Sequence, residues 1–244
     1  MDRLLPSHES DIDAYDAYRP ADPRAPLVRI NMVASVDGRI ADGDGVSGGL
    51  GGAGDQQVFF ALRNMADAIV AGAGTVRAEG YGPMRPRPGH ADQRRTDGLD
   101  GPVPIVVVTR SMDLDTGSAL FTAAVAPTVV LTTVDAPSEA VGAVRDAGGI
   151  VVQVGRRDVD LASGIAILGR KHGLHHLLIE GGPRLNGHLL AAGLADELCL
   201  TIAPQLVGGG DARRVVDGLD VPHDLRLTRA LVHDGELLLT YGRR

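Results

Sequence analysis

The sequence predicts an α/β fold with one mostly parallel central sheet of about eight strands, helices on both faces and an antiparallel C-terminal edge. First, short runs rich in Val and Ile alternate with segments of helical periodicity, which is typical of parallel sheets. Second, the last apolar stretch, 227–244, has a turn signal at Asp234 and Gly235 and no helix between its halves, which indicates a hairpin. Third, many of the 33 glycines fall where an apolar run ends, so that backbone there can approach a ligand closely.

The strands are expected at short apolar runs that are bounded by turn-forming residues. In chain order these runs are 27–35, 66–72, 103–109, 128–133, 150–154, 175–180, 196–207 and the hairpin 227–244. The helices expected between them are 55–65, 136–149, 158–173 and 183–194. Asp55 is a good N-cap for the first helix, and Pro183 suits the first turn of the last one, where its missing N–H costs little.

Two polar segments lie outside this pattern. Residues 1–26 contain several acids and a few prolines, and we expect them to form an irregular N-terminal arm. Residues 27–244 are expected to form a single domain, because no linker or internal repeat interrupts the pattern. The stretch 82–102 is expected to be a long loop, and the sequence leaves open whether it closes over a ligand.

Composition limits the possible partners. The net charge of −7 argues against a nucleic-acid-binding surface, although single basic sites can still bind phosphates. The one cysteine, Cys199, permits no intrachain disulfide, and we expect it to be a core residue of a cytoplasmic protein. No leader is evident and no apolar run approaches the roughly 20 residues of a membrane helix, so we expect no membrane partner.

No metal site is expected. A zinc deaminase would pair an H-x-E motif with P-C-x-x-C, and the chain has neither. His172, His175 and His176 are close together, but no nearby acid or cysteine completes a ligand set. We interpret these histidines as residues of a helix end and a strand.

Three strand ends have residues suited to anions, and ligands of open α/β sheets bind at such ends. In 70–80, Gly72 and Gly74 let backbone N–H groups meet an anion, and Thr75 and Arg77 add donors. The spacing matches neither a phosphate-binding loop nor the dinucleotide fingerprint, so a tight turn with a surface arginine explains it equally well.

The second strand end has Thr109, Arg110 and Ser111 after a buried run. Two hydroxyl groups around a guanidinium suit a phosphate monoester, although a solvated strand end is an equal alternative.

The third strand end is the stretch Glu180-Gly181-Gly182-Pro183. The glycines leave room for a pyrophosphate, and the helix that follows offers free N–H groups and a positive dipole end. Because a carboxylate would repel a phosphate at the same spot, Glu180 is expected to face another part of the site.

A polar cluster early in the chain comprises Asn31, Ser35, Asp37, Ser47 and Asp55. Asn31 and Ser35 are four residues apart, so on a strand they point to the same face. Asp37 with the following glycine also fits a simple turn, and Asp55 also fits a helix cap.

Four segments together resemble a known family: 31–41 (NMVASVDGRIA), 49–79, 179–190 (IEGGPRLNGHLL) and 194–209. They look like the pyrimidine reductase family of riboflavin biosynthesis, which includes the C-terminal reductase domain of the bifunctional deaminase/reductase. The resemblance covers about residues 27 to 240, and the deaminase half is absent.

The resemblance implies a dihydrofolate reductase-like fold, NADPH as cofactor and a homodimer. It implies hydride delivery to C1 of the ribosyl group of 2,5-diamino-6-ribosylamino-4(3H)-pyrimidinone 5′-phosphate. Glu180 and Glu79 would then lie near the reacting ribose, with Asn31, Ser35 and Ser47 on the substrate side. The residues expected at the cofactor are Ala34, Gly72, Gly74, Thr75, Arg77, Thr109, Arg110, Ser111, Gly181, Gly182, Pro183 and Leu185.

Two features leave alternatives open. Many bifunctional members have a lysine where this chain has Asn31, so the role of that lysine cannot be transferred. Asp55 resembles the carboxylate by which dihydrofolate reductases bind the pterin ring, so it is a third catalytic candidate beside Glu180 and Glu79. The substrate is therefore a phosphorylated pyrimidine or a pteridine, with dihydrofolate reduction as one alternative activity and a non-catalytic NADPH-binding module as another. The sequence does not decide which group supplies the proton.

Overall fold

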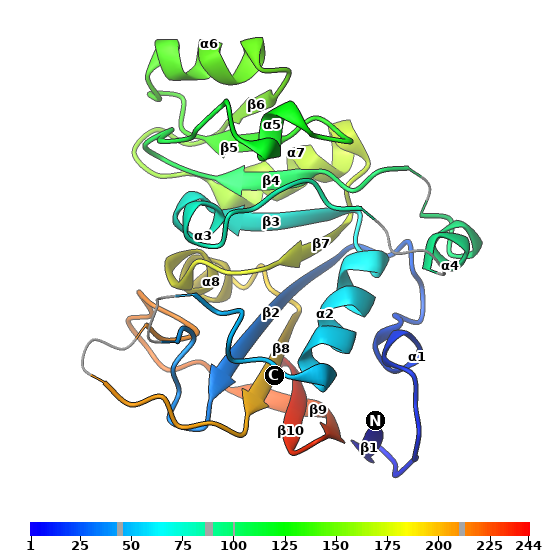
Figure 1. Ribbon diagram of the computed structural model, residues 1–244. Coiled ribbons are helices and arrows are strands. Elements are labelled where there is room, and N and C mark those ends of the chain that lie inside the picture. The colour runs from blue at the N-terminus through cyan, green and yellow to red at the C-terminus, as the bar shows by residue number, and fades with distance from the viewer. Residues whose placement is uncertain (43–45, 86–89, 100, 210–212) are drawn as a thin grey trace.

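The computed structural model describes residues 1–42, 46–85, 90–99, 101–209 and 213–244. These residues form a 10-stranded sheet in the order β1-β9-β10-β8-β2-β7-β3-β4-β5-β6 (Figure 1). The strands are β1 (Asp2–Leu5), β2 (Leu27–Ser35), β3 (Ala68–Gly72), β4 (Ile105–Val108), β5 (Val129–Thr132), β6 (Ile150–Gln153), β7 (His176–Ile179), β8 (Glu197–Ala203), β9 (Leu225–His233) and β10 (Glu236–Arg243). The helices are α1 (Ala14–Tyr18), α2 (Ala53–Met65), α3 (Ala73–Ala78), α4 (His90–Thr96), α5 (Ala119–Thr122), α6 (Ser138–Asp146), α7 (Leu161–His172) and α8 (Pro183–Ala191).

The sheet confirms the predicted α/β class. From β8 through β2, β7, β3, β4 and β5 to β6, every neighbouring pair is parallel. The β9–β10 hairpin and β1 add an antiparallel edge beyond β8. Strands β7, β3 and β4 are adjacent and parallel. The three strand ends at which anion-binding residues were predicted therefore lie together at one edge of the sheet.

Helices cover both faces of the sheet, and the alternation of side chains along the strands decides which face each residue joins. On one face, Leu168 of α7 and Leu189 of α8 pack with Val70 and Ile179. On the other face, α1 and α2 pack over Leu178, Cys199 and Leu238. Farther along this second face, α3, α5 and α6 cover Ile69, Ala71 and Val107. Cys199 is a buried core residue, as predicted.

The N-terminal segment is more ordered than the expected irregular arm. Strand β1 pairs antiparallel with β9, and Tyr15 and Tyr18 of α1 are buried against α2. The Tyr15 hydroxyl donates to the Asp97 Oδ2 atom at 2.6 Å, which fastens the segment to the chain after α4. The apolar spacing of 14–18 was the signal for this helix, but five residues are too few to show a period.

Other boundaries also differ from the predictions. Helix α2 begins at Ala53, and its N-cap residue is Gly52 rather than Asp55. The glycine-rich stretch after β3 folds into the short helix α3, and part of the expected loop 82–102 forms α4, while 86–89 and 100 lie outside the described residues. Strand β8 ends at Ala203, short of the predicted 207. None of the helices in the described ranges is both long and apolar enough to cross a bilayer.

Candidate active site

Two cavities meet at the carboxyl ends of the parallel strands. The larger, about 1070 Å³, lies over the ends of β3, β4 and β7, and we call it the glycine-rich cavity after Gly72, Gly74, Gly181 and Gly182. The smaller, about 520 Å³, lies beside α2 and α3, and we call it the acidic cavity after Asp55 and Glu79. Residues that line both cavities are Met32, Ile40, Ser47, Thr75, Glu79 and Glu180. A ligand in one cavity is therefore in reach of a ligand in the other.

Bare backbone forms the floor of the glycine-rich cavity. Gly181 and Gly182 have φ angles of +101° and +95°, a region that side chains strongly disfavour. A Cβ on Gly181 would lie 3.2 Å from the sulfur of Met32. The Gly72 N–H donates to the Gly181 carbonyl at 3.1 Å, so the ends of β3 and β7 are tied together. The glycine pair thus lets two strand ends and the start of α8 approach one another without side chains between them.

Helix α8 begins directly after this floor, with Pro183 in its first turn. The first turn of a helix has N–H groups without helical acceptors and a positive dipole end. Pro183 and Leu185 both line the glycine-rich cavity, as do Gly181 and Gly182. The structure therefore brings the predicted anion-binding residues of this strand end to one wall.

The end of β4 divides into one inward and two outward residues. Thr109 is buried, and its Oγ1 accepts from the Met112 N–H at 3.0 Å, so this hydroxyl is used within the turn. Arg110 and Ser111 are exposed and line the far part of the glycine-rich cavity. Among the described residues, Arg110 makes one long contact with Asp158, 3.5 Å between Nη1 and Oδ1, which leaves its guanidinium available to a ligand.

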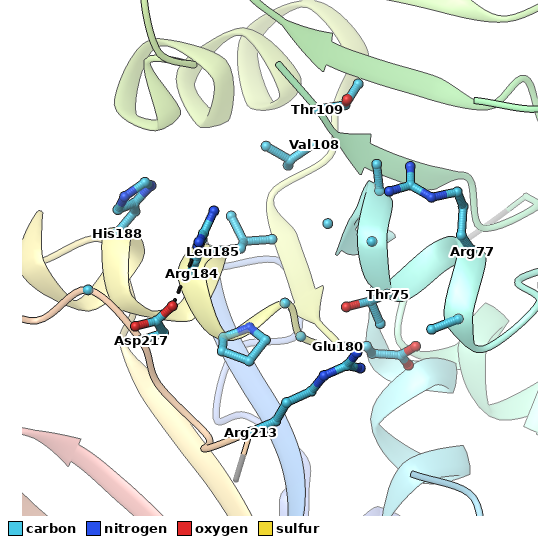
Figure 2. Close-up of a pocket in the computed structure, with 18 of the residues that line it drawn as sticks. Thr75, Arg77, Val108, Thr109, Glu180, Arg184, Leu185, His188, Arg213 and Asp217 are labelled. Atoms are coloured by element: carbon cyan, nitrogen blue, oxygen red, sulfur yellow. Dashed lines mark hydrogen bonds and ion pairs between the residues drawn. The ribbon is translucent and has the colours of Figure 1, made fainter. Parts of the chain in front are cut away.

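Further basic side chains surround the same cavity (Figure 2). Arg77, which was expected in a glycine-rich turn, lies on α3, lines the cavity and donates to the Asp113 carbonyl at 2.7 Å. Arg184, His188 and Arg213 also line the cavity, and the sequence analysis missed them. Arg184 and His188 are four residues apart on α8, so helical spacing from Pro183 was the signal that could have found them.

Glu180 is the most tightly held side chain of the site. It is 8% exposed, and Arg63 donates from Nε to Oε1 and from Nη2 to Oε2, both at 2.6 Å. The Tyr81 hydroxyl donates to Oε2 at 2.7 Å. Burial raises the pKa of Tyr81 well above its ordinary value, and the Glu180 charge adds to this, so the phenol stays a donor. Every partner donates to Glu180, which fits a fixed carboxylate and not a proton donor.

Arg63 is in turn held by aromatic rings. Its guanidinium carbon lies 4.1 Å from the centroid of the Phe59 ring and 5.7 Å from that of Tyr81, close enough for cation–π attraction. Asp55, Phe59 and Arg63 follow one another at spacings of four along α2, and all three line the acidic cavity. Phe59, Arg63 and Tyr81 were not predicted from the sequence. The four-residue spacing from Asp55 was a usable signal for Phe59 and Arg63, whereas Tyr81 lies beyond α3 and has no such signal.

Glu79 differs from Glu180 in its surroundings. It follows α3, is half-buried and lines both cavities. Its Oε1 accepts from the Ser47 N–H at 2.9 Å, and within the described part of the chain its second oxygen has no hydrogen-bond partner. Glu79 is therefore an acid at the junction of the cavities with one oxygen available to a ligand.

Asp55 lies away from the junction, in the first turn of α2, and lines the acidic cavity. Burial raises the pKa of Asp55, the nearby Glu236 charge adds to the rise, and a hydrogen bond with Thr201 opposes it. A carboxyl group with a raised pKa in a cavity is a frequent feature of functional sites.

The remaining predicted residues separate into two groups. Asn31 and Ser47 line the acidic cavity, as expected for substrate-side residues. Ser35 and Ala34 line neither cavity: Ala34 is buried, and the Ser35 hydroxyl donates to Asp37 Oδ1 at 2.6 Å. This bond and the N–H groups of the chain at 207–208 hold the pKa of Asp37 at about 2. The end of β2 thus turns away from the cavities before Ser35 can reach them.

Comparison with known proteins identifies the family of this chain. The sequence model of the RibD C-terminal domain family matches residues 26–239. A protein of Methanothermobacter thermautotrophicus named 2,5-diamino-6-ribosylamino-4(3H)-pyrimidinone 5′-phosphate reductase is 36% identical over 88% of this chain and 97% of its own length. A protein of the same name from Archaeoglobus fulgidus is 32% identical over 79% of this chain and 87% of its own.

Solved structures share the fold. A pyrimidine reductase-like protein of Corynebacterium diphtheriae superposes with a TM-score of 0.83 at 26% identity, covering 95% of this chain and 98% of its own. RibD of Acinetobacter baumannii superposes with a TM-score of 0.72 at 21% identity, covering 91% of this chain and 58% of its own.

These relatives are reductases, so the chain is an oxidoreductase, which sets aside the alternative of a non-catalytic module. The chain belongs to the RibD C-terminal domain family, the pyrimidine reductase family of riboflavin biosynthesis, as the sequence motifs predicted.

Proposed function

We propose that this protein is an NADPH-dependent reductase that converts the ribosyl side chain of 2,5-diamino-6-ribosylamino-4(3H)-pyrimidinone 5′-phosphate to the ribityl chain. One observation carries the proposal: a large glycine-floored cavity and a smaller acidic cavity share a wall that contains Thr75, Glu79 and Glu180. Such a pair of cavities lets a dinucleotide and a small substrate meet at one point. The names of two archaeal relatives that align over most of their length give the substrate class.

The glycine-rich cavity fits a phosphorylated dinucleotide. Gly181 and Gly182 hold backbone in a positive-φ conformation beside the start of α8, which suits a pyrophosphate. Arg110 and Ser111 lie at the far part, where they suit the 2′-phosphate that distinguishes NADPH from NADH. Thr75, Gly74 and Arg77 then contact the middle of the cofactor from α3. In this proposal Thr109 lines the cofactor cavity and holds the turn after β4, whereas Ala34 lines neither cavity and does not touch the cofactor.

NADPH, when bound, supplies a hydride, which together with one proton reduces the C1=N bond of the ring-opened ribosylamine to an amine. Glu79 is our candidate for passing that proton to the nitrogen, directly or through a water. It lies at the junction, and no described residue makes a hydrogen bond to its second oxygen. Glu180 orders the site instead, since Arg63 and Tyr81 occupy both of its oxygens.

Asp55 is our candidate for holding the pyrimidinone ring. An ionised carboxylate can accept from a ring N–H and from the neighbouring amino group, and Asp55 presents its carboxyl at the acidic cavity. Asn31, also in this cavity, adds an amide whose Oδ1 has no partner in the described part of the chain. The same arrangement suits the pterin ring of dihydrofolate, so Asp55 is the observation that keeps dihydrofolate reduction as a second candidate.

The test is NADPH oxidation by the purified protein with the ribosylamino-pyrimidinone phosphate and with dihydrofolate in parallel. Turnover of the first substrate with the higher kcat/KM is expected. Turnover of dihydrofolate alone would reject the riboflavin assignment in favour of the second candidate. The Asp55→Asn variant sharpens the comparison, because its loss should be larger for folate reduction than for ribose reduction.

We also propose a homodimer. The register of β8 and β10 places Leu237 opposite Ile202 and Leu239 opposite Leu200, on the sheet face away from α1 and α2. Leu237 is 42% exposed, and Leu227 of β9, which lies opposite Tyr241, is 39% exposed. An apolar sheet face of this kind suits a second copy of the chain. Sedimentation of the wild type and of Leu237→Glu tests this, with a dimer expected for the first and a monomer for the second.

A further inference from the structure

Two carboxyl groups lie at the start of α2, and they have different partners. Glu236, the first residue of β10, is 1% exposed. Its Oε1 accepts from the Gly52 N–H at 2.7 Å, and its Oε2 accepts from the N–H groups of Gly54 at 2.7 Å and Asp55 at 3.2 Å. Glu236 therefore accepts from the free N–H groups at the start of α2, as an N-cap side chain does. It lies 181 to 184 residues from these groups in the sequence.

The glycines before α2 make this arrangement possible. A Cβ on Gly54 would lie 2.8 Å from Glu236 Oε2, and one on Gly52 would lie 3.1 Å from the Glu236 carboxyl carbon. A Cβ on Gly51 would collide with the Asp55 carboxyl. The glycine-rich stretch 48–54 thus leaves space for two acids at one helix start.

Asp55 is left with other partners. Its backbone N–H donates to Glu236. Its carboxyl lies near the Thr201 hydroxyl, which lowers the pKa of Asp55, and it borders the acidic cavity. An acid in the first turn of a helix ordinarily folds back onto the free N–H groups. Here Glu236 already occupies those groups.

We propose that Glu236 is a positioning residue for substrate recognition: it occupies the N–H groups at the start of α2 and so leaves the Asp55 carboxyl to the acidic cavity and the substrate ring. The inference rests on the proposed function, in which Asp55 holds the pyrimidinone ring. It adds a residue that does not touch the substrate and acts through its neighbour.

The charge of Glu236 affects the pKa of Asp55, so the proposed role can be measured as a change in pH dependence. Burial is the first cause of the raised pKa of Asp55, and the Glu236 charge is the next that raises it. His233 of β9 packs near Gly54, and Glu79, Arg63, Tyr81 and Glu180 are the other titratable groups around the acidic cavity in the described ranges. Asp55 accepts from the ring N–H and the amino group only as a carboxylate. Binding of the pyrimidine is therefore expected at pH values above the pKa of Asp55, and is lost as the pH falls through that pKa. Neutralising Glu236 lowers that pKa and moves the loss to lower pH.

The experiment is the pH profile of kcat/KM for Glu236→Gln with NADPH saturating. We expect the acid limb to move to lower pH, through KM for the pyrimidine, with plateau kcat within about twofold of the wild type because no reacting group is removed. Asp234→Asn is the matched control: it removes an exposed charge from the same hairpin and should leave the profile unchanged. In an Asp55→Asn background, Glu236→Gln should produce no further movement.

A second variant covers the loss of the helix cap. Gly52→Ser combined with Glu236→Ala supplies a local cap, and the φ of −94° at Gly52 is open to serine. Circular dichroism and thermal unfolding establish that each variant is folded, and the same movement of the acid limb is expected. A folded variant with an unmoved acid limb, or an equal movement in Asp234→Asn, would overturn the inference. Failure of the proposed function is separate, because the wild type itself would then not turn over the pyrimidine.

Discussion

Arg63 and Glu180 form an ion pair with two parallel hydrogen bonds, each 2.6 Å, under the wall that the two cavities share. The side chains are 20% and 4% exposed, so the pair is largely out of water. A bidentate arginine–carboxylate pair fixes both distance and orientation. Glu180 comes from the end of β7 and Arg63 from the last turns of α2, so the pair joins the floor of one cavity to the wall of the other.

Removing one partner of this pair should be costly. Arg63→Ala leaves the Glu180 carboxylate buried and unpaired, and we expect a loss of about 3–5 kcal/mol in the free energy of unfolding. The double variant Arg63→Ala/Glu180→Gln should recover part of the loss, because the unpaired charge is gone. Chemical denaturation of the single and double variants measures both effects. Additive losses would show that the pair is not coupled.

Glu79 and Glu180 should differ in kinetics. If Glu79 passes the proton, Glu79→Gln lowers kcat by roughly 10²–10⁴-fold with a smaller change in KM, since general acid–base contributions have this size. Tyr81→Phe, which removes only the hydroxyl that donates to Glu180, should change kcat far less and serves as the comparison. Steady-state kinetics with the pyrimidine substrate decide the matter. A Glu79→Gln enzyme with near-normal kcat would exclude Glu79 from the proton transfer.

Arg110 should determine the preference for the phosphorylated cofactor. Arg110→Ala is expected to weaken NADPH binding by about 1–3 kcal/mol, through loss of a charge-assisted contact, and to leave NADH binding nearly unchanged. Arg156→Ala is a matched control, because Arg156 is an exposed arginine outside both cavities. Calorimetric titration with each cofactor gives the affinities. Equal weakening of both would place the 2′-phosphate elsewhere.

Acid should destabilise the fold partly through His176. This residue is 1% exposed, and burial, followed by the charges of Arg29 and Arg94, lowers its pKa to about 3. The unfolded chain takes up the proton near pH 6.5 while the folded chain does not, so the contribution to stability is present above 6.5 and is lost as pH falls towards 3. At about 1.4 kcal/mol per pKa unit, the loss approaches about 5 kcal/mol.

The measurement is the free energy of unfolding between pH 7 and pH 4 for the wild type, His176→Gln and His172→Gln. The His176→Gln curve should be flatter than the wild-type curve. His172 is exposed, so its variant should follow the wild type. Parallel curves for all three proteins would show that His176 takes up its proton equally well in the folded state.

Much of the site could be predicted because the carboxyl ends of parallel strands lie at the same edge of a sheet. Gly72, Arg110 and Gly181 are far apart in the chain, yet each lies at or just after the end of a buried strand, and β7, β3 and β4 are neighbours in the sheet. The local pattern of an apolar run followed by glycines or hydroxyl side chains was therefore enough to predict that these residues belong to one site. The hairpin at Asp234 and Gly235 is confirmed for the same reason, since its signal is local.

The parts that were missed depend on contacts that a local pattern does not record. The N-cap at Asp55 was wrong because Glu236 reaches the start of α2 from β10. Ser35 matched Asn31 in spacing, but the turn held by Asp37 takes it out of the cavity. Glu180 was correctly placed at the joint, but its pairing with Arg63 and Tyr81, which argues against proton donation, became visible only in three dimensions.

The central claim is that a hydride crosses from the glycine-rich cavity to a sugar carbon held at the junction with the acidic cavity. Its most direct test is turnover of the ribosylamino-pyrimidinone phosphate with NADPH that carries deuterium at the transferable position, followed by mass spectrometry and NMR of the product. The account predicts one deuterium at C1 of the ribityl chain. Product without deuterium at C1, or with deuterium on the ring, would contradict it.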